Sequence, residues 1–431
     1  MKPETASTGP GSALRNRNFA LLWTGQTVSI AGNGIYAVAL PLEVFRFTDN
    51  ALDLAVVLGA NTVPMVALLL IAGAIVDRVS RRLVMLLSNT VNGLLFTLMT
   101  VVISTGQIRL WMLVACSLVT GTTLAFFLPA SSAIFRDILP PELMVNANSL
   151  SSLSQGLAQY MAGPLLGGVI VAAGGTAWAF GSDAASFLVS FGCLAAMSGT
   201  VRRTAGDAGG AAHRAGAQLL AEMRAGLRYC RSRAWLWWSM LAMAVANFAC
   251  FTPLFVFEPL LVRHFFGGKA VALGLIFAAN GAGGTLASLY ITRYGAPRKR
   301  IAAVWAGLSG CGAGTALLGI SPSIWMATIL AGLLWAAATY GNILWLATIQ
   351  EAVPPGLLGR VASLDWLVSS ALAPLGILAG GALASAAGVR AALVTGGVVA
   401  ACAGSVALLP RVREPDRRPG ASVTEPSKAE A

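Results

Sequence analysis

The sequence GAIVDRVSRR (residues 73–82) places a short charged turn between two long apolar segments. The segment before the turn reads LAVVLGANTVPMVALLLIAG, and the segment after it reads LVMLLSNTVNGLLFTLMTVVI. Neither contains a charged residue. Each segment is longer than the roughly 18 predominantly apolar residues that indicate a membrane-spanning helix. The stretch therefore predicts two membrane-spanning helices joined by a turn outside the bilayer.

The composition of the whole chain indicates the same class of protein. Of 431 residues, 56% are hydrophobic and 11% are charged. Soluble domains carry about 25% charged residues, so a soluble fold of this length would lack polar surface. The first apolar segment begins at Phe19 and has no cleavage site of small residues, so we expect it to stay as the first helix. The six cysteines show no metal-ligand spacing, and we expect neither a metal nor a cofactor.

Hydropathy predicts an all-α membrane protein with twelve spans rather than alternating strands. We expect these spans near residues 19–41, 52–75, 83–104, 110–135, 147–173, 178–199, 234–262, 270–292, 301–320, 323–349, 362–386 and 389–409.

The distribution of positive charge predicts the orientation of these spans. Of the 29 Lys and Arg residues, only five fall in the odd-numbered loops, which leaves 24 on the other side: the five are Arg46, Arg109, Arg263, Lys269 and Arg390. Positive residues mark the cytoplasmic side, so we expect both termini in the cytoplasm of a bacterial cell, with the chain in its inner membrane. The net charge of +12 is then an orientation signal, and we expect no nucleic-acid partner.

An internal repeat predicts how the spans are grouped. The segment ILPPELMVNANSLSSL from Ile138 is similar to AVPPGLLGRVASLDWL from Ala352, with Pro141 over Pro355 and, further on, Gly174 over Gly388. Two like halves argue for two six-helix bundles around a central pathway. The expected domains are a tail at 1–18, bundles at 19–199 and 234–409, a cytoplasmic linker at 200–233 and a disordered tail at 410–431. Within the linker we expect an amphipathic helix with Leu219, Leu220, Met223 and Leu227 on one face.

With these features in place, the chain resembles the major facilitator superfamily of secondary transporters. The superfamily's motif between helices two and three is matched by Gly73, Asp77, Arg78, Arg81 and Arg82, although Ser80 stands where glycine is usual. The resemblance implies a cytoplasmic latch in which Asp77 pairs with a basic residue such as Arg136. The alternative is that these charges only fix the topology.

A second motif implies the direction of transport. AGPLLGG (residues 162–168) resembles an element of the antiporters of this superfamily, with matches at Gly163, Pro164, Gly167 and Gly168. Ordinary packing of small residues is the alternative reading. Further segments, among them RNRNFALLWTGQTVS and LAEMRAGLRY, resemble the drug:proton antiporter-3 branch, which includes macrolide and siderophore exporters and lysophospholipid transporters. The arginine that many drug antiporters carry within span four is absent here.

Polar residues inside the spans are candidates for the substrate cavity, because they are costly in lipid and usually face a cavity or another helix. Stripes at helical spacing on spans one, five and seven, with single residues on spans two, eight and ten, give Gln26, Asn33, Tyr36, Asn61, Gln155, Gln159, Asn247, Asn280 and Asn342. Each could instead serve as a contact between helices.

Four acidic residues in or near the spans are candidates for proton coupling: Glu258, Glu43, Asp183 and Asp365. Glu258 ranks first, because Pro253 and Pro259 flank it and loosen the helix there. The alternative places Glu43 and Glu258 among lipid headgroups without a role in coupling.

The sequence therefore predicts a monomeric proton-coupled exporter of amphipathic small molecules. Its partners would be the substrate, protons and the lipid bilayer. An uptake symporter or a lysophospholipid transporter is the alternative within transport, and a non-transporting membrane sensor is the alternative outside it. No loop combines a nucleophile, a base and metal ligands, so we do not expect an enzyme.

Overall fold

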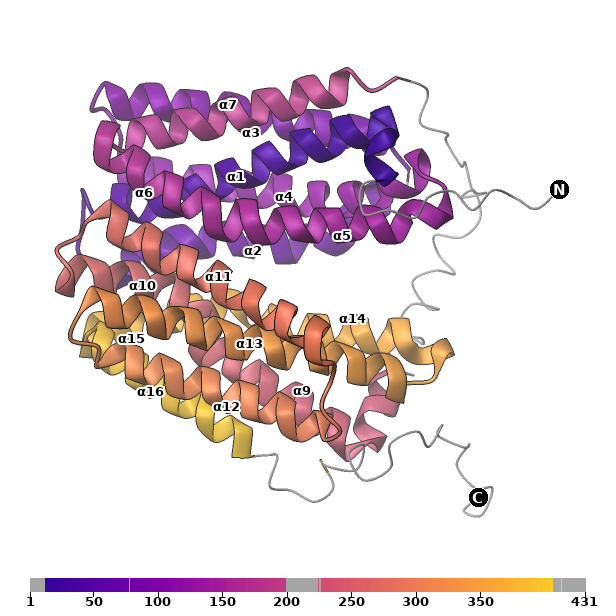
Figure 1. Ribbon diagram of the computed structural model, residues 1–431. Helices are drawn as coiled ribbons and strands as arrows, with labels where there is room; N and C mark the ends of the chain where they lie inside the picture. Colours follow the sequence, from indigo (N-terminus) through magenta and orange to yellow (C-terminus); the bar gives the residue numbers. More distant parts are fainter. Residues whose placement is uncertain (1–11, 77, 199–223, 225, 406–411, 413–431) are drawn as a thin grey trace, which may run out of the picture. The chain divides into compact units, whose positions relative to one another are not determined.

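The computed structural model describes residues 12–76, 78–198, 224, 226–405 and 412 (Figure 1). Every regular element within this part of the chain is a helix. Eleven of the described helices are long and apolar enough to cross a membrane, and Val389–Ala403 is a shorter apolar helix. The predicted all-α membrane fold is confirmed, and each of the twelve predicted spans falls on one of these twelve helical segments.

The contacts group the chain into two compact units, of which the first comprises residues 1–206 and 256–282. Its helical segments are η1 (Ser12–Arg15), α1 (Arg17–Val44), α2 (Ala51–Val76), α3 (Arg81–Ser104), α4 (Leu110–Ile138), η2 (Pro141–Leu143), α5 (Met144–Ser154), η3 (Gln155–Ala162), α6 (Gly163–Gly174) and α7 (Thr176–Ala195), with most of α10 (Thr252–Phe265) and the first half of α11 (Ala270–Tyr294).

The second unit comprises residues 207–255 and 283–431. Besides the remaining parts of α10 and α11, its helical segments are α9 (Ala234–Ala246), η4 (Asn247–Phe251), α12 (Arg300–Gly319), α13 (Ile324–Ala352), α14 (Pro355–Ala371), α15 (Ala373–Ala387) and α16 (Val389–Ala403). Of the predicted linker helix, residues 226–232 are helical, whereas Leu219, Leu220 and Met223 lie outside the described residues. The boundaries predicted for the two bundles stay a prediction.

Helix α7 packs against both α1 and α3 in the first unit (Figure 1). The core at the predicted cytoplasmic end of this unit is apolar and includes Phe19, Met85, Ile134 and Leu194. The opposite end, which holds the turn between α1 and α2, is called the outer end below. Its turn is closed by Asn50, whose side chain accepts a hydrogen bond from the backbone N–H of Leu52 at 2.9 Å.

The internal repeat is visible in the helix ends, with a shift of one residue. Pro141 and Pro355, which begin corresponding segments, lie 214 positions apart. At the other end of these spans, the backbone turns at Gly175 and Gly388, with φ of 81° and 86°, and these positions lie 213 apart. Glycine is favoured there because other residues rarely adopt positive φ. The predicted pairing of Gly174 with Gly388 is therefore wrong by one residue.

Two spans contain a wider, π-helical turn just before a proline. Segment η3 precedes Pro164, and segment η4 precedes Pro253. A proline ring cannot donate a backbone hydrogen bond and collides with the carbonyl group four residues earlier, which favours widening of that turn. The predicted polar stripes on spans five and seven assumed α-helical spacing throughout. Because η3 and η4 interrupt that spacing, those two stripes are not continuous α-helical faces.

Candidate functional site

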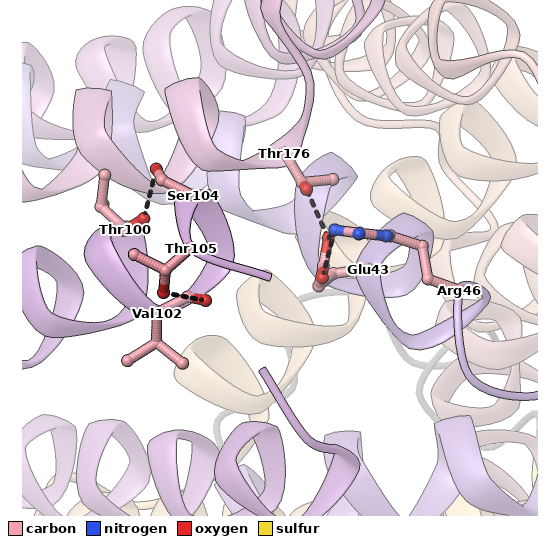
Figure 2. A network of polar contacts seen from close by, with 7 residues as sticks. All are labelled: Glu43, Arg46, Thr100, Val102, Ser104, Thr105 and Thr176. Atoms are coloured by element: carbon pink, nitrogen blue, oxygen red, sulfur yellow. Dashed lines mark hydrogen bonds and ion pairs between the residues drawn. The ribbon is translucent and has the colours of Figure 1, made fainter. Parts of the chain in front are cut away.

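Glu43 is a fully buried carboxylate with a charged partner at the outer end of α1 (Figure 2). The guanidinium of Arg46, one turn further along the chain, donates from Nη1 to both carboxylate oxygens at 2.9 and 3.1 Å. The hydroxyl of Thr176, the first residue of α7, donates a further hydrogen bond to Glu43. The carboxylate thus ties the end of α1 to the start of α7 with its charge compensated.

Asp183 lies on α7 and is fully buried as well, but its surroundings are neutral. The Ser186 hydroxyl lies 3.0 Å from Oδ1, while Oδ2 has no hydrogen-bond partner among the described residues. The backbone of α1 approaches closely at Gly32, where an added Cβ would overlap the Asp183 carboxyl and the Ser186 side chain. Glycine at this position gives the carboxyl its space.

Glu258 on α10 is 2% exposed and contacts α11. The Asn280 side-chain amide donates to its two carboxylate oxygens at 3.1 and 3.0 Å. Asn280 was predicted as a cavity residue and Glu258 as a proton carrier, and the structure brings the two side chains together. The fourth acid, Asp365 on α14, is partly buried and accepts from the indole Nε1 of Trp345 at 3.2 Å to each oxygen.

The polar residues predicted to line the cavity have different surroundings. The Asn61 amide donates to the Thr120 hydroxyl of α4 at 2.9 Å, which is the contact between helices that was the alternative for it. The Tyr36 ring packs edge-on against Phe96 and Phe180. Of the remaining candidates, Gln155 and Asn342 are exposed, and Gln26, Asn33, Gln159 and Asn247 are partly buried.

In the charged turn, the arginines bind the ends of two neighbouring helices. Arg81 forms an ion pair with Asp137 of α4 at 2.5 Å. Arg82 donates to the carbonyl oxygens of Leu194 and Ala195 at 3.0 and 2.9 Å, where the last carbonyl groups of α7 attract a cation.

The other members of the predicted latch differ in how far the structure describes them. Gly73 is partly buried, and Arg78 and Arg136 are exposed. Asp77 lies outside the described residues, so its expected pairing with Arg136 stays a prediction.

The glycines of the AGPLLGG motif allow backbones to touch. An added Cβ at Gly163 would lie 2.8 Å from the Cα of Gly34 on α1, and one at Gly167 would lie 2.9 Å from the Cα of Ile35. A Cβ at Gly168 would lie 2.9 Å from the carbonyl oxygen of Ala270 on α11. Helix α6 is therefore held between α1 and α11 without intervening side chains, an arrangement that small residues permit in membrane helices.

A shallow pocket of about 330 Å³ opens beside this seam at the outer end of the first unit. Arg46 and Arg263 line it, together with Thr176 and neighbouring apolar residues. Arg263 forms an ion pair with Asp49 at 2.8 Å, and its guanidinium lies over the Phe45 ring.

Sequence reasoning missed several partners of the predicted residues: Arg46, Thr176, Asp137, Ser186 and Trp345. Two of them had a usable signal, because Arg46 follows Glu43, and Ser186 follows Asp183, at the spacing of one helical turn. The others lie on different helices, and nothing in the sequence singles them out.

The sequence matches the family model described as transmembrane secretion effector over residues 8–430. A curated relative, the multidrug efflux pump Tap of Mycolicibacterium fortuitum, is 27% identical, and the match covers 92% of this chain and 96% of that protein. Macrolide efflux protein A of Streptococcus pyogenes is 20% identical, with coverage of 89% and 93%.

Solved structures show the same fold at low identity. The nucleoside transporter NupG superposes with a TM-score of 0.67 at 12% identity, over 91% of this chain and 99% of that one. A bacterial homologue of the human lysosomal transporter Spinster, inward-facing and occupied, has a TM-score of 0.68, at 16% identity and with coverage of 91% and 96%. The family match spans nearly the whole chain, and the chain belongs to the transmembrane secretion effector family of the major facilitator superfamily, a family of multi-pass membrane transporters and not of enzymes.

Proposed function

We propose that this chain exports amphipathic small molecules, such as a drug, a natural product or a siderophore, in exchange for protons. The relatives named as multidrug and macrolide efflux proteins match it over most of their length and support export. The expected substrate is neutral or cationic, because the candidate cavity residues are eight amides and one tyrosine rather than fixed charges.

The observation that carries proton coupling is the burial of Glu258 inside a membrane-spanning segment, with the Asn280 amide bound to its carboxylate oxygens. An ionisable side chain is costly there and is retained chiefly for function. The Asn280 amide can donate to the carboxylate and, through its own oxygen, accept from the protonated acid, so the contact persists in both states. Pro259 follows directly within α10 and removes one backbone hydrogen bond, which makes movement of this turn easier.

Transport would proceed by alternating access, with the substrate site reached from one side of the membrane at a time. In this scheme the charged turn acts at the cytoplasmic end and the glycine motif limits leak at the outer end. Both termini would face the cytoplasm of a bacterial cell, and the chain would act as a monomer.

The test uses the full-length protein in liposomes with a trapped pH dye and an imposed proton gradient. A panel of macrolides, lipophilic cations, siderophores and lysolipids is added in turn. We expect at least one compound to speed the loss of the gradient and to move against the protons. Glu258→Gln should abolish this exchange, whereas Glu142→Gln, the same change at an exposed position in η2, should preserve it.

A compound that moves in the same direction as the protons would contradict export and identify a symporter. Movement of lysolipid alone, without dependence on the gradient, would support lipid transport instead. If the Glu258→Gln protein still exchanged substrate for protons at the full rate, Glu258 would not be the proton-coupling residue.

A further inference from the structure

Of the buried side-chain polar atoms in the first unit that have no hydrogen-bond partner among the described residues, three belong to one cluster: Asp183 Oδ2, Tyr36 Oη and Ser117 Oγ. They come from α7, α1 and α4, so three helices direct a polar group into the same region. Buried polar atoms are nearly always hydrogen-bonded, and each exception calls for an explanation. Glu258, which carries the proposed function, lies on a different helix.

The side chains around Asp183 form a small polar cluster in an aromatic wall. The Tyr36 hydroxyl lies beside Ser117 and the thiol of Cys116, and both Tyr36 and Cys116 lie within electrostatic range of Asp183. From α3, Phe96 closes the cluster by packing against Tyr36 and Phe187. Tyr36 and Cys116 are thus the titratable groups that face Asp183 from the described helices. Asp183 forms no ion pair within this part of the chain.

We propose that Asp183 is a second proton-binding site, with the Tyr36 hydroxyl as the polar group that faces it from α1. The proton binds to Oδ2, which has no hydrogen-bond partner among the described residues. When the proton leaves, the carboxylate keeps the Ser186 hydroxyl as a donor to Oδ1. No other bond forms or breaks. The assignment of this proton to transport rests on the proposed function, whereas its binding does not.

The geometry distinguishes this site from the other acids. A carboxylate enclosed by apolar helices without a cation is costly, and uptake of a proton removes the charge. Glu43 is equally buried but has Arg46 at 2.9 Å, so its charge is already compensated. Gly32 lets the backbone of α1 contact the Asp183 carboxyl, so a change in the protonation of Asp183 acts directly on α1.

Infrared spectroscopy of the full-length protein in liposomes tests the binding step without any substrate. A protonated carboxylic acid gives a carbonyl band that is distinct from the amide bands and shifts in heavy water. We expect a component of this band at neutral pH in the wild type and in Asp53→Asn, a matched change at the outer end of α2, and its loss in Asp183→Asn. Identical spectra of the wild type and Asp183→Asn at every pH would overturn the proposal.

Two further measurements keep the proposal testable if Asp183→Asn fails to fold. Tyr36→Phe keeps the ring packing and removes one hydroxyl, so we expect the band to persist with a shifted pH midpoint. An unshifted pH midpoint would show that the Tyr36 hydroxyl is not part of the proton-binding site. Replacing choline by sodium at constant ionic strength should leave the band unchanged, and its loss would show that the site takes sodium rather than a proton.

Transport then tests whether this proton is moved. Once a substrate has been found, we expect Asp183→Asn to transport it with one proton fewer per molecule than the wild type. An unchanged proton count, with the band present, would leave proton binding at Asp183 intact and overturn its part in coupling. If no compound is transported at all, the infrared result still stands or falls by itself.

Discussion

Glu43 and Asp183 lie on neighbouring helices of the first unit, α1 and α7, and both side chains are fully buried. Glu43 contacts a guanidinium at 2.9 Å and accepts a hydrogen bond from the Thr176 hydroxyl. Asp183 is hydrogen-bonded to Ser186 at one oxygen and has no partner for the other among the described residues. The two carboxyl groups are therefore equally buried, but Glu43 has a cation beside it and Asp183 has only neutral groups.

Burial alone therefore does not assign a role to an acid in a membrane helix. A buried carboxylate with a cation is a structural tie, and its charge need not change. A buried carboxylate among hydroxyls and aromatic rings has a reason to exchange a proton. From the sequence both residues were candidates for proton coupling, because their positions in or near the spans were visible and their partners were not.

The largest effect is expected when Glu43 is given the surroundings of Asp183. Arg46→Met removes the cation and leaves a buried charge, so the free energy of unfolding should fall by about 2 kcal/mol. This is below the value for a fully buried pair because the Arg46 side chain is 52% exposed. Denaturant unfolding in detergent measures the change. Arg109→Met, at an exposed outer arginine, is the control. Equal stability of the two variants would contradict a stabilising role for the ion pair between Arg46 and Glu43.

A somewhat smaller effect is expected from crowding Asp183. Gly32→Ala places a Cβ against the Asp183 carboxyl and 2.8 Å from the Cβ of Ser186, so helices α1 and α7 must separate slightly. Overpacking of this kind costs about 1–2 kcal/mol of unfolding free energy. Gly192→Ala is the matched control, because a Cβ there meets nothing within 4 Å. A stabilised Gly32→Ala protein would contradict the close approach.

The hydroxyl partners give a sharper comparison at smaller magnitude. Ser186→Ala removes the donor to Asp183 and should lower the unfolding free energy by about 1 kcal/mol. Thr176→Val removes one donor from Glu43, which keeps Arg46, so its cost should be smaller than that of Ser186→Ala. Thermal unfolding of both variants in one detergent decides the order, and the reverse order would contradict the comparison.

The smallest effect is expected at the outer surface, where Arg263 and Asp49 form an ion pair in water. Their side chains are 39% and 63% exposed, and such pairs contribute about 0.5 kcal/mol. A double-mutant cycle with Arg263→Ala and Asp49→Ala measures the coupling energy directly. It should fall further in high salt because the charges are screened. If the coupling energy of Arg263 and Asp49 were as large as the effect of Arg46→Met, solvent exposure would not explain the difference between this ion pair and the pair of Arg46 with Glu43.

The spans could be predicted from sequence because continuous apolar segments have few alternatives in a membrane. The end of α4 was predicted at residue 135 and lies at Ile138, since the last turn carries Arg136 and Asp137 and is less apolar than the rest. Such errors arise where a helix continues beyond the hydrocarbon region of the bilayer.

The partners within the site could not be predicted, because they depend on how each helix is rotated. Arg136 and Asp137 are adjacent in sequence, yet they point about 100° apart around α4. Only Asp137 faces α3, where it binds Arg81. Sequence reasoning selected Arg136 for its charge, and it had no information on rotation. The same limit applies to Thr176, whose contact with Glu43 spans 133 residues.

The π-helical segment η3 has a consequence for how the two halves of the chain should be aligned. The offset between the halves is 214 at Pro141 and 213 at Gly175, so the fifth span contains one inserted residue. A widened turn absorbs such an insertion without a loop. Beyond η3, the glycine motif then corresponds to Gly376, Gly380 and Gly381, three glycines that are also buried. A gap-free alignment would misplace this motif by about 100° of helix rotation. Deleting one residue from η3 should therefore restore α-helical geometry there, while the polar half and the glycine half of the span keep their rotation relative to each other.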